Sequence, residues 1–235
     1  MITFEIILTG NLSHLVHSAR VQRRLPAVTT VKDALEAMGI PHVEIGAVTL
    51  DGHQATIDHL IQDQMTLIAH PVAPMPVAAP SFICDVHLGK LARLLRFCGF
   101  DTVWNRTWRE ETLARLASRE DRLLLSRHRA LLKRKTIKNG MLIRSGDADQ
   151  QLIEVLRRFR ITDRINRPGR CASCNGVLQF TPRDQVSTPI PPLTAAWRDE
   201  YWVCRQCGHL FWNGTHVEHL NNRVETAIHH ADRDD

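Results

Sequence analysis

The chain has 235 residues, of which 43% are hydrophobic, and it carries a formal net charge of +5. This length exceeds a typical domain of about 100–150 residues, and the composition is that of a globular protein. We find neither a run of about 18 apolar residues nor a basic-then-apolar leader, so we expect no membrane span and no secretory signal. The prediction is a cytoplasmic protein built from two or three modules.

The positive charge is concentrated in the middle of the chain. Residues 81–170 carry 21 Lys and Arg against 10 Asp and Glu, a net charge of +11, whereas residues 1–80 and 171–235 each have a net charge of −3. A basic domain between mildly acidic ones is typical of a polyanion binder, because phosphate contacts release counterions. A solvated Arg-rich surface would give the same count, so charge alone leaves nucleic-acid binding open.

The first part of the chain has the pattern of a β-grasp module, which we assign to residues 1–72. Apolar residues alternate from Ile2 to Leu8, as in a half-buried strand. Thr30 precedes an amphipathic segment that Gly39 ends, as in a capped helix. Further strands are expected at 19–25, 43–50 and 65–69.

A proline-rich stretch follows this module. Four prolines and no glycine occur from His70 to Pro80. Such a composition favours an extended, semi-rigid spacer. We therefore place a linker at residues 73–80.

Short apolar runs then alternate with helical patterns over residues 81–165. Such alternation predicts an α/β domain with a parallel sheet, whose ligands bind at the carboxyl ends of the strands. The expected strands are 81–84, 100–104, 122–125 and 141–144, and the expected helices are 87–98, 109–118, 127–135 and 148–159.

Several acids occur where these strands end. Asp85 directly follows the first strand, Glu110 and Glu111 begin a helix, and Asp147 and Asp149 flank the start of another. Carboxylates gathered at one sheet edge could hold the divalent cations that phosphodiester cleavage requires. The same acids could instead cap helices or favour the helix dipole, an explanation that suits Asp85 least.

Basic residues adjoin this acidic set. Lys90, Arg93 and Arg96 lie in the helix after Asp85, and Arg127 follows the third strand. We predict that these four side chains contact phosphates.

The six cysteines divide into two pairs and two single residues. Cys84 and Cys98 have apolar surroundings and are expected in the core. The two Cys-x-x-Cys pairs predict a closed tetrahedral Zn²⁺ site, whereas disulfides would need an oxidising compartment. Of the nearby residues His209, His216 and His219, none is needed as a ligand. The paired residues are Cys171, Cys174, Cys204 and Cys207, in a zinc-stabilised unit at 166–220 that precedes a C-terminal tail at 221–235.

Together these motifs resemble the Mut-7 C-terminal RNase family, in which a PIN-like nuclease domain carries a zinc ribbon. The segment from Gly39 to Gly46 is similar to the ubiquitin-like module fused to that domain. The resemblance implies a PIN-like three-layer α/β domain after a ubiquitin-like β-grasp domain, with Asp85 as the first metal-binding acid. It rests on Phe82-Ile-Cys-Asp85, Leu88-Gly-Lys-Leu-Ala-Arg-Leu-Leu-Arg96, Gly99-Phe-Asp101, Gln151-Leu152, Arg170-Cys171-x-x-Cys174-Asn175, Cys204-x-x-Cys207-Gly208 and Trp212-Asn-Gly-Thr-His216.

One position departs from the family. Where Thr-Arg-Asp usually follows the third strand, this chain has Ser126-Arg127-His128, and an imidazole weakens a Mg²⁺ site made of oxygen ligands. Our leading hypothesis is an RNA-binding, Mg²⁺- or Mn²⁺-dependent ribonuclease that uses Asp85, Glu111 and Asp147 or Asp149. An RNA-binding adaptor without cleavage and a protein-interaction scaffold acting through the β-grasp module remain as alternatives.

Overall fold

The computed structural model describes residues 1–191 and 198–233. The chain divides into two compact units. The first comprises Met1–Ala73 and Arg109–Leu142, and the second comprises Pro74–Trp108 and Ile143–Asp235.

The first unit begins with a five-stranded mixed sheet of order β2-β1-β7-β4-β5. Alternate residues of strand β1, Phe4, Ile6 and Leu8, are buried, as are Val31 and Leu35 of helix α2. These side chains form the core, and the predicted β-grasp fold is confirmed. Its elements are β1 (Ile2–Leu8), α1 (Leu12–Val16), β2 (Arg20–Leu25), β3 (Thr29–Thr30), α2 (Val31–Ala37), η1 (His42–Glu44), β4 (Ile45–Leu50), β5 (His53–Ala55), β6 (Leu60–Ile61) and β7 (Thr66–Pro71).

Local chemistry explains where helix α2 begins and ends. The Thr30 side-chain oxygen accepts a hydrogen bond from the backbone N–H of Asp33 at 3.0 Å, which satisfies one of the free donors of the first turn. Gly39 has a φ of +93°, a conformation that glycine adopts without a steric penalty. The helix therefore stops where the sequence predicted.

The rest of the first unit supplies two strands and two helices of the α/β domain. Strands β10 and β11 pair in parallel, as predicted. The elements are α4 (Glu110–Arg119), β10 (Leu123–Ser126), α5 (Arg129–Leu132) and β11 (Gly140–Leu142).

The β-grasp module contacts these elements through η1. Glu44 is only 3% exposed, and its Oε1 accepts a hydrogen bond from the backbone N–H of Leu142 at 2.8 Å. The His42 ring lies 2.7 Å from the Ile137 carbonyl oxygen and 2.7 Å from the Glu36 carboxylate. The segment from Gly39 to Gly46 thus contacts the α/β half of its own unit, and Arg129 of α5 adds a bond to the Leu15 carbonyl at 3.1 Å.

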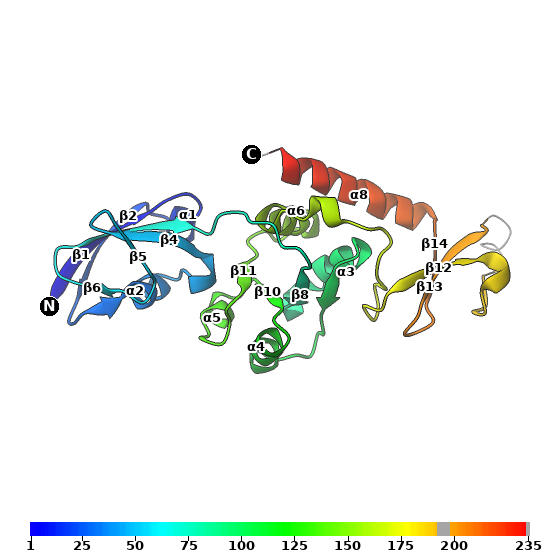
Figure 1. The fold of residues 1–235 in the computed structure, drawn as a ribbon, viewed down its shortest axis with the longest axis horizontal. Coiled ribbons are helices and arrows are strands. Elements are labelled where there is room, and N and C mark those ends of the chain that lie inside the picture. The colour runs from blue at the N-terminus through cyan, green and yellow to red at the C-terminus, as the bar shows by residue number, and fades with distance from the viewer. Residues whose placement is uncertain (192–197, 234–235) are drawn as a thin grey trace. The chain divides into compact units, whose positions relative to one another are not determined.

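The second unit holds the other parallel pair, β8 and β9. Phe82 of β8 packs against the rings of Phe100 and Phe159, and helix α8 lies along α6 (Figure 1). The elements are β8 (Ser81–Cys84), η2 (Val86–Leu88), α3 (Gly89–Phe97), β9 (Asp101–Val103), α6 (Ala148–Phe159), η3 (Thr162–Arg164), β12 (Leu178–Pro182), η4 (Arg183–Gln185), β13 (Glu200–Cys204), β14 (Leu210–Trp212) and α8 (Thr215–Asp232).

The proline-rich stretch is hydrogen-bonded to the second unit. The backbone N–H groups of Met75 and Val77 donate to the carbonyls of Arg158 and Phe159, each at 3.1 Å. Because the intervening prolines have no N–H, alternate residues make these bonds. The segment is extended, as expected, and is tied to the end of α6.

Helix α8 covers most of the segment that we expected to form a tail. Val224 and Ala227 are buried on its inner side. Thr162 donates a hydrogen bond to the Asp232 carboxylate at 3.0 Å, and Arg157 donates to the His230 carbonyl at 2.9 Å. The predicted boundary at residue 220 falls inside this helix, and residues 234–235 lie outside the described residues.

Candidate metal centre and nucleic-acid interface

Two turns of the same geometry carry the four paired cysteines. The backbone N–H of Asn175 donates to the Cys171 carbonyl, and that of Gly208 donates to the Cys204 carbonyl, each at 2.9 Å. Asn175 and Gly208 both have a φ of +69°, in the left-handed region that asparagine and glycine tolerate best. Each turn therefore directs its two thiols toward the same point.

The four thiols meet as the spacing predicted. The Sγ atoms of Cys171, Cys174, Cys204 and Cys207 all lie within 4.8 Å of one another, and three of the separations are 3.4, 3.4 and 3.7 Å. A tetrahedral ion with metal–sulfur bonds of about 2.3 Å requires sulfurs separated by roughly 3.8 Å. The site therefore fits a metal such as zinc, without a histidine ligand.

Backbone hydrogen bonds favour a thiolate at one of these ligands. Burial raises the pKa of Cys204, but the backbone N–H groups of Cys207 and Gln206 outweigh it, so the pKa is lowered to about 7. A thiolate is the form that binds metal. Cys84 and Cys98 lie apart from this cluster in the core, as predicted, and burial raises the pKa of each thiol.

Arg96 connects the cysteine turns to the α/β domain. It is only 4% exposed, and its guanidinium donates to the carbonyls of Thr102 and Ala172, each at 2.8 Å, and to that of Ser173 at 3.3 Å. Because these bonds occupy the guanidinium in a buried position, the predicted phosphate contact of Arg96 is incorrect. Its role is structural.

Asn175 makes a second connection between the same parts. Its side-chain oxygen accepts from the backbone N–H of Thr102 at 3.0 Å, and its side-chain amide donates to Asp101 at 2.8 Å. The backbones of Gly99 and Gly169 approach so closely that a Cβ on Gly169 would lie 2.3 Å from the Gly99 Cα. Motifs far apart in the sequence thus form one packed connection.

Asp85 lies where the prediction placed it, at the carboxyl end of β8. It is 3% exposed, and its Oδ1 accepts a hydrogen bond from the backbone N–H of His87 at 2.9 Å, which caps η2. The capping explanation therefore applies to Asp85 as well, contrary to the expectation from the sequence, and its metal-binding role stays a prediction.

A cavity of about 370 Å³ adjoins this strand end, and we name it the strand-end cavity. It is lined by Val86 and His87, which follow Asp85, and by Gly146 and Ala148, which flank Asp147. Lys90 and Arg93 supply its positive charge. Both side chains are exposed, and their contact with phosphates stays a prediction.

The other two acids that the sequence predicted for the metal site in this unit, Asp147 and Asp149, have partners. Asp147 caps α6 by accepting from the backbone N–H groups of Asp149 and Gln150, and the Gln150 bond, before others, holds the pKa of Asp147 below its ordinary value. Asp149 forms a bidentate ion pair with Arg223 of α8, in which Nη2 donates to Oδ1 at 2.7 Å and Nε donates to Oδ2 at 3.1 Å.

The remaining acids belong to the first unit. Glu111 is mostly exposed, and its own backbone N–H and the Arg134 guanidinium hold its pKa below the ordinary value. Its neighbour Glu110 contacts the ring of His128, the residue that replaces the family's acid. The sequence predicted Glu111 in the metal site, because the helix pattern does not show that Glu110 is the acid beside His128. Arg127 is exposed in the same unit.

Family comparisons agree with the architecture. A model described as the Mut7-C RNAse domain matches residues 80–224, which is more than half of the chain, and one described as Mut7-C ubiquitin matches residues 2–75. The chain belongs to the Mut7-C RNAse domain family. Within residues 1–191 and 198–233, no helix is both long and apolar enough to cross a bilayer.

Two solved structures are similar to part of this Mut7-C protein. Small archaeal modifier protein 1 from H. volcanii is 20% identical and covers 31% of this chain and 100% of its own, with a TM-score of 0.27. A putative molybdopterin converting factor, subunit 1, from Pyrococcus furiosus is 11% identical with the same coverage and TM-score. No curated protein matches the chain.

Proposed function

We propose that this Mut7-C protein is an RNA-binding, metal-dependent ribonuclease. The observation that carries the proposal is the buried carboxylate of Asp85 at the end of a parallel strand, beside a cavity lined by Lys90 and Arg93. Ligands of parallel α/β sheets bind at this end of the strands. The family match supplies the expectation that the bound ligand is RNA.

The acids of the proposed site are Asp85 and Asp147, with Asp149 and Glu111 as further candidates. Their oxygen ligands suit Mg²⁺ or Mn²⁺, which when bound would activate water and stabilise the leaving oxygen. Asp147 uses one carboxylate oxygen for its helix cap, whereas Asp149 is held by Arg223 and Glu111 by Arg134. This difference favours Asp85 and Asp147 as the principal ligands.

The basic side chains would position the RNA. Lys90 and Arg93 adjoin the strand-end cavity of the second unit, and exposed Arg127 of the first unit is a separate candidate for a phosphate contact. Since each phosphate contact releases counterions, binding should weaken steeply with salt. Zinc would be structural, because four thiolates leave no open coordination position. The metal-ligating thiols further suggest a reducing compartment, such as the cytoplasm.

A second candidate function is RNA binding without cleavage. It is favoured by His128, which contacts Glu110 where the family usually has another acid. A neutral or cationic ring contributes no negative charge to a Mg²⁺ site. Substituting His128→Asp distinguishes the two candidates, because it restores cleavage only if the wild-type protein is a degenerate nuclease.

The proposal is tested by incubating zinc-loaded protein with mixed RNA and either Mn²⁺ or Mg²⁺. Asp85→Asn keeps the helix cap, because asparagine caps as well as aspartate, but it removes the charge. We expect cleavage to fall by about 100-fold or more, as for the loss of a metal ligand. Asp163→Asn is the matched control, since Asp163 is an exposed acid that pairs with Arg164. Equal cleavage by both variants would reject Asp85 as a catalytic acid.

A further inference from the structure

The zinc ribbon carries a row of aromatic rings on one face of its three-stranded sheet. Phe180 pairs directly with Trp202, and Trp202 pairs directly with Phe211, so the three side chains lie on the same face. The Phe180 and Trp202 rings meet edge to face at 5.8 Å. Trp202 and Phe211 are only partly buried. The exposed parts of these aromatic rings can stack against a planar group of a ligand.

Two helices complete a cavity over this row, and we name it the aromatic cavity. Its volume is about 390 Å³, within the range of small-ligand pockets. Leu94 and Phe97 of α3 and Val217 and Leu220 of α8 supply apolar walls opposite Trp202 and Phe211. Residues three or four apart share one helix face, so each helix presents a continuous stripe to the cavity.

Positive charge surrounds these apolar walls. Lys90 and Arg93 of α3, Arg170, and Arg223 of α8 all line the aromatic cavity. Lys90 and Arg93 also line the strand-end cavity beside Asp85. The two cavities are therefore neighbours that share the same pair of cations.

We propose that the aromatic cavity binds an unpaired nucleobase of single-stranded RNA, next to the nucleotide whose phosphate lies at the strand-end cavity. The inference rests on the proposed RNA-directed function and assigns part of the substrate site to the zinc ribbon. The base stacks on Trp202 and Phe211, while Lys90 and Arg93 contact the adjoining phosphate. A single strand is favoured over a duplex, because a paired base would first have to unpair and unstack at a cost in free energy.

The combination of rings and cations decides between possible occupants. Stacking of a base on an aromatic side chain contributes to binding for every base, because each base has a π-face, and cations alongside follow the backbone. Arg170 and Arg223 already pair with Asp101 and Asp149. Even so, a purely apolar partner segment would gain nothing from the exposed cations Lys90 and Arg93. A nucleotide matches both the walls and the charge.

The test measures binding of a labelled single-stranded RNA and a duplex of the same sequence by fluorescence anisotropy, in the Asp85→Asn background without added divalent ions. Trp202→Leu keeps an apolar side chain but removes the aromatic ring, whereas Trp202→Phe keeps an aromatic ring. We expect Trp202→Leu to weaken single-strand binding about tenfold or more, Trp202→Phe to weaken it about threefold or less, and both to leave duplex binding unchanged. Zinc content and thermal unfolding verify that both variants fold.

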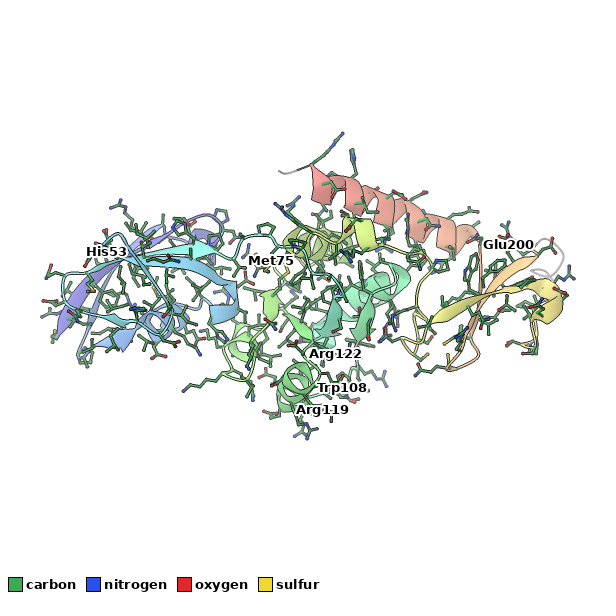
Figure 2. All side chains as sticks on the ribbon, in the orientation of Figure 1. His53, Met75, Trp108, Arg119, Arg122 and Glu200 are labelled. Atoms are coloured by element: carbon green, nitrogen blue, oxygen red, sulfur yellow. The ribbon has the colours of Figure 1, made fainter. Side chains whose placement is uncertain are left out.

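Salt dependence separates the base contact from the phosphate contacts. Trp202→Leu should leave the slope of log affinity against log salt unchanged. Lys90→Ala combined with Arg93→Ala should reduce it by about 1.4, the value for two phosphates on a single strand. Arg119→Ala is the control for loss of a surface charge, because Arg119, labelled in Figure 2, is exposed and pairs with Glu120. It lines neither of the two cavities. It should leave the slope much less changed than the double variant does.

Several outcomes would overturn the inference. One is equal single-strand affinity of Trp202→Leu and its parent. A second is equal weakening by the leucine and phenylalanine variants. A third is that Trp202→Leu changes the oligomeric state of the protein and leaves RNA binding unchanged, which would make the cavity a contact between copies of this chain. Failure of the proposed ribonuclease is distinguishable, since single-strand binding that depends on Trp202 without any cleavage in Mn²⁺ leaves the base-binding cavity intact. Cleavage that is insensitive to Trp202 rejects the cavity alone.

Discussion

The zinc ribbon and the β-grasp module contact the α/β domain through different chemistry. The ribbon is held by Arg96, whose buried guanidinium serves three carbonyls, two of them in a metal-binding turn. The β-grasp module is held by Glu44 and His42, which hydrogen-bond to single backbone groups. Arg129 and Lys133 of the α/β domain also donate to its Leu15 and Glu36 carbonyls. The ribbon connection includes a metal-supported turn and the β-grasp connection does not, so we expect the first to depend on zinc and the second to be independent of it.

This difference assigns separate tasks to the two modules. The ribbon supplies an aromatic wall to a cavity that it shares with α3 and α8. Unfolding of the ribbon should therefore weaken RNA binding. The β-grasp module uses its family-specific segment to hold β11 and the loop before it. We therefore expect disruption of this contact to lower stability with little effect on the RNA-binding cavities of the other unit.

Loss of the metal should have the largest effect. Structural zinc sites contribute on the order of 10 kcal/mol in peptide models, so Cys174→Ser should unfold the ribbon and abolish single-strand RNA binding. Zinc content measured with protease sensitivity of residues 166–220 checks this. The β-grasp module should keep its protection in the same digest, and its simultaneous unfolding would contradict the separation of the two contacts.

Removal of Arg96 should have the next largest effect. Arg96→Ala leaves the buried Thr102 carbonyl and two partly buried carbonyls without their donor and should cost about 3 kcal/mol of unfolding free energy. Arg93→Ala on the same helix is the matched control, because Arg93 is exposed and should affect RNA binding far more than stability. Similar stability losses in the two variants, measured by urea unfolding, would argue against the structural role.

Disruption of the β-grasp contact should be smaller. Glu44→Ala leaves the buried N–H of Leu142 unsatisfied, which should cost about 2 kcal/mol. Glu44→Gln keeps an acceptor oxygen and should recover most of that loss. Hydrogen exchange of the Leu142 amide reports the contact directly, and unchanged protection in Glu44→Ala would show that the bond is not maintained in solution.

The helix cap at Asp147 should have the smallest effect, and it depends on pH. In the folded protein the pKa of Asp147 is lowered, mainly by the hydrogen bond from the Gln150 N–H. Ionised Asp147 therefore stabilises the fold at pH values above the unfolded-state pKa, and this stabilisation is lost as the pH falls through the folded-state pKa. Asp147→Ala should therefore lower Tm slightly at pH 7, with a difference from wild type that shrinks at pH 3. A constant difference across this range would mean that the carboxylate charge does not contribute.

The sequence predicted the elements and motifs that depend on local patterns. Alternation, helix caps and Cys-x-x-Cys spacing are local signals, so strands such as β1, the Thr30 cap and the cysteine cluster could be inferred. The small elements α1, β3 and β6 were missed because a few residues carry no recognisable period. Helix α8 and its contacts with α6 were missed because the sequence of α8 is mostly polar.

The partners of the buried polar residues could not be predicted. Arg96 follows Arg93 by the same three residues that separate Arg93 from Lys90, and all three were assigned to phosphates. At 100° per residue, however, Arg96 lies about 120° around the helix from Lys90, which brings it to the buried side. Glu44 finds its partner 98 residues away, on the backbone of Leu142, where no side-chain pattern marks it.

The central claim is that Asp85 holds a divalent cation at the end of β8, and Mn²⁺ binding to zinc-loaded protein tests it most directly. Electron paramagnetic resonance can measure free Mn²⁺ during titration of the wild type, Asp85→Asn and the control Asp163→Asn. We predict that Asp85→Asn weakens Mn²⁺ binding by about tenfold or more while Asp163→Asn matches the wild type. Equal Mn²⁺ affinity in all three proteins would contradict the claim.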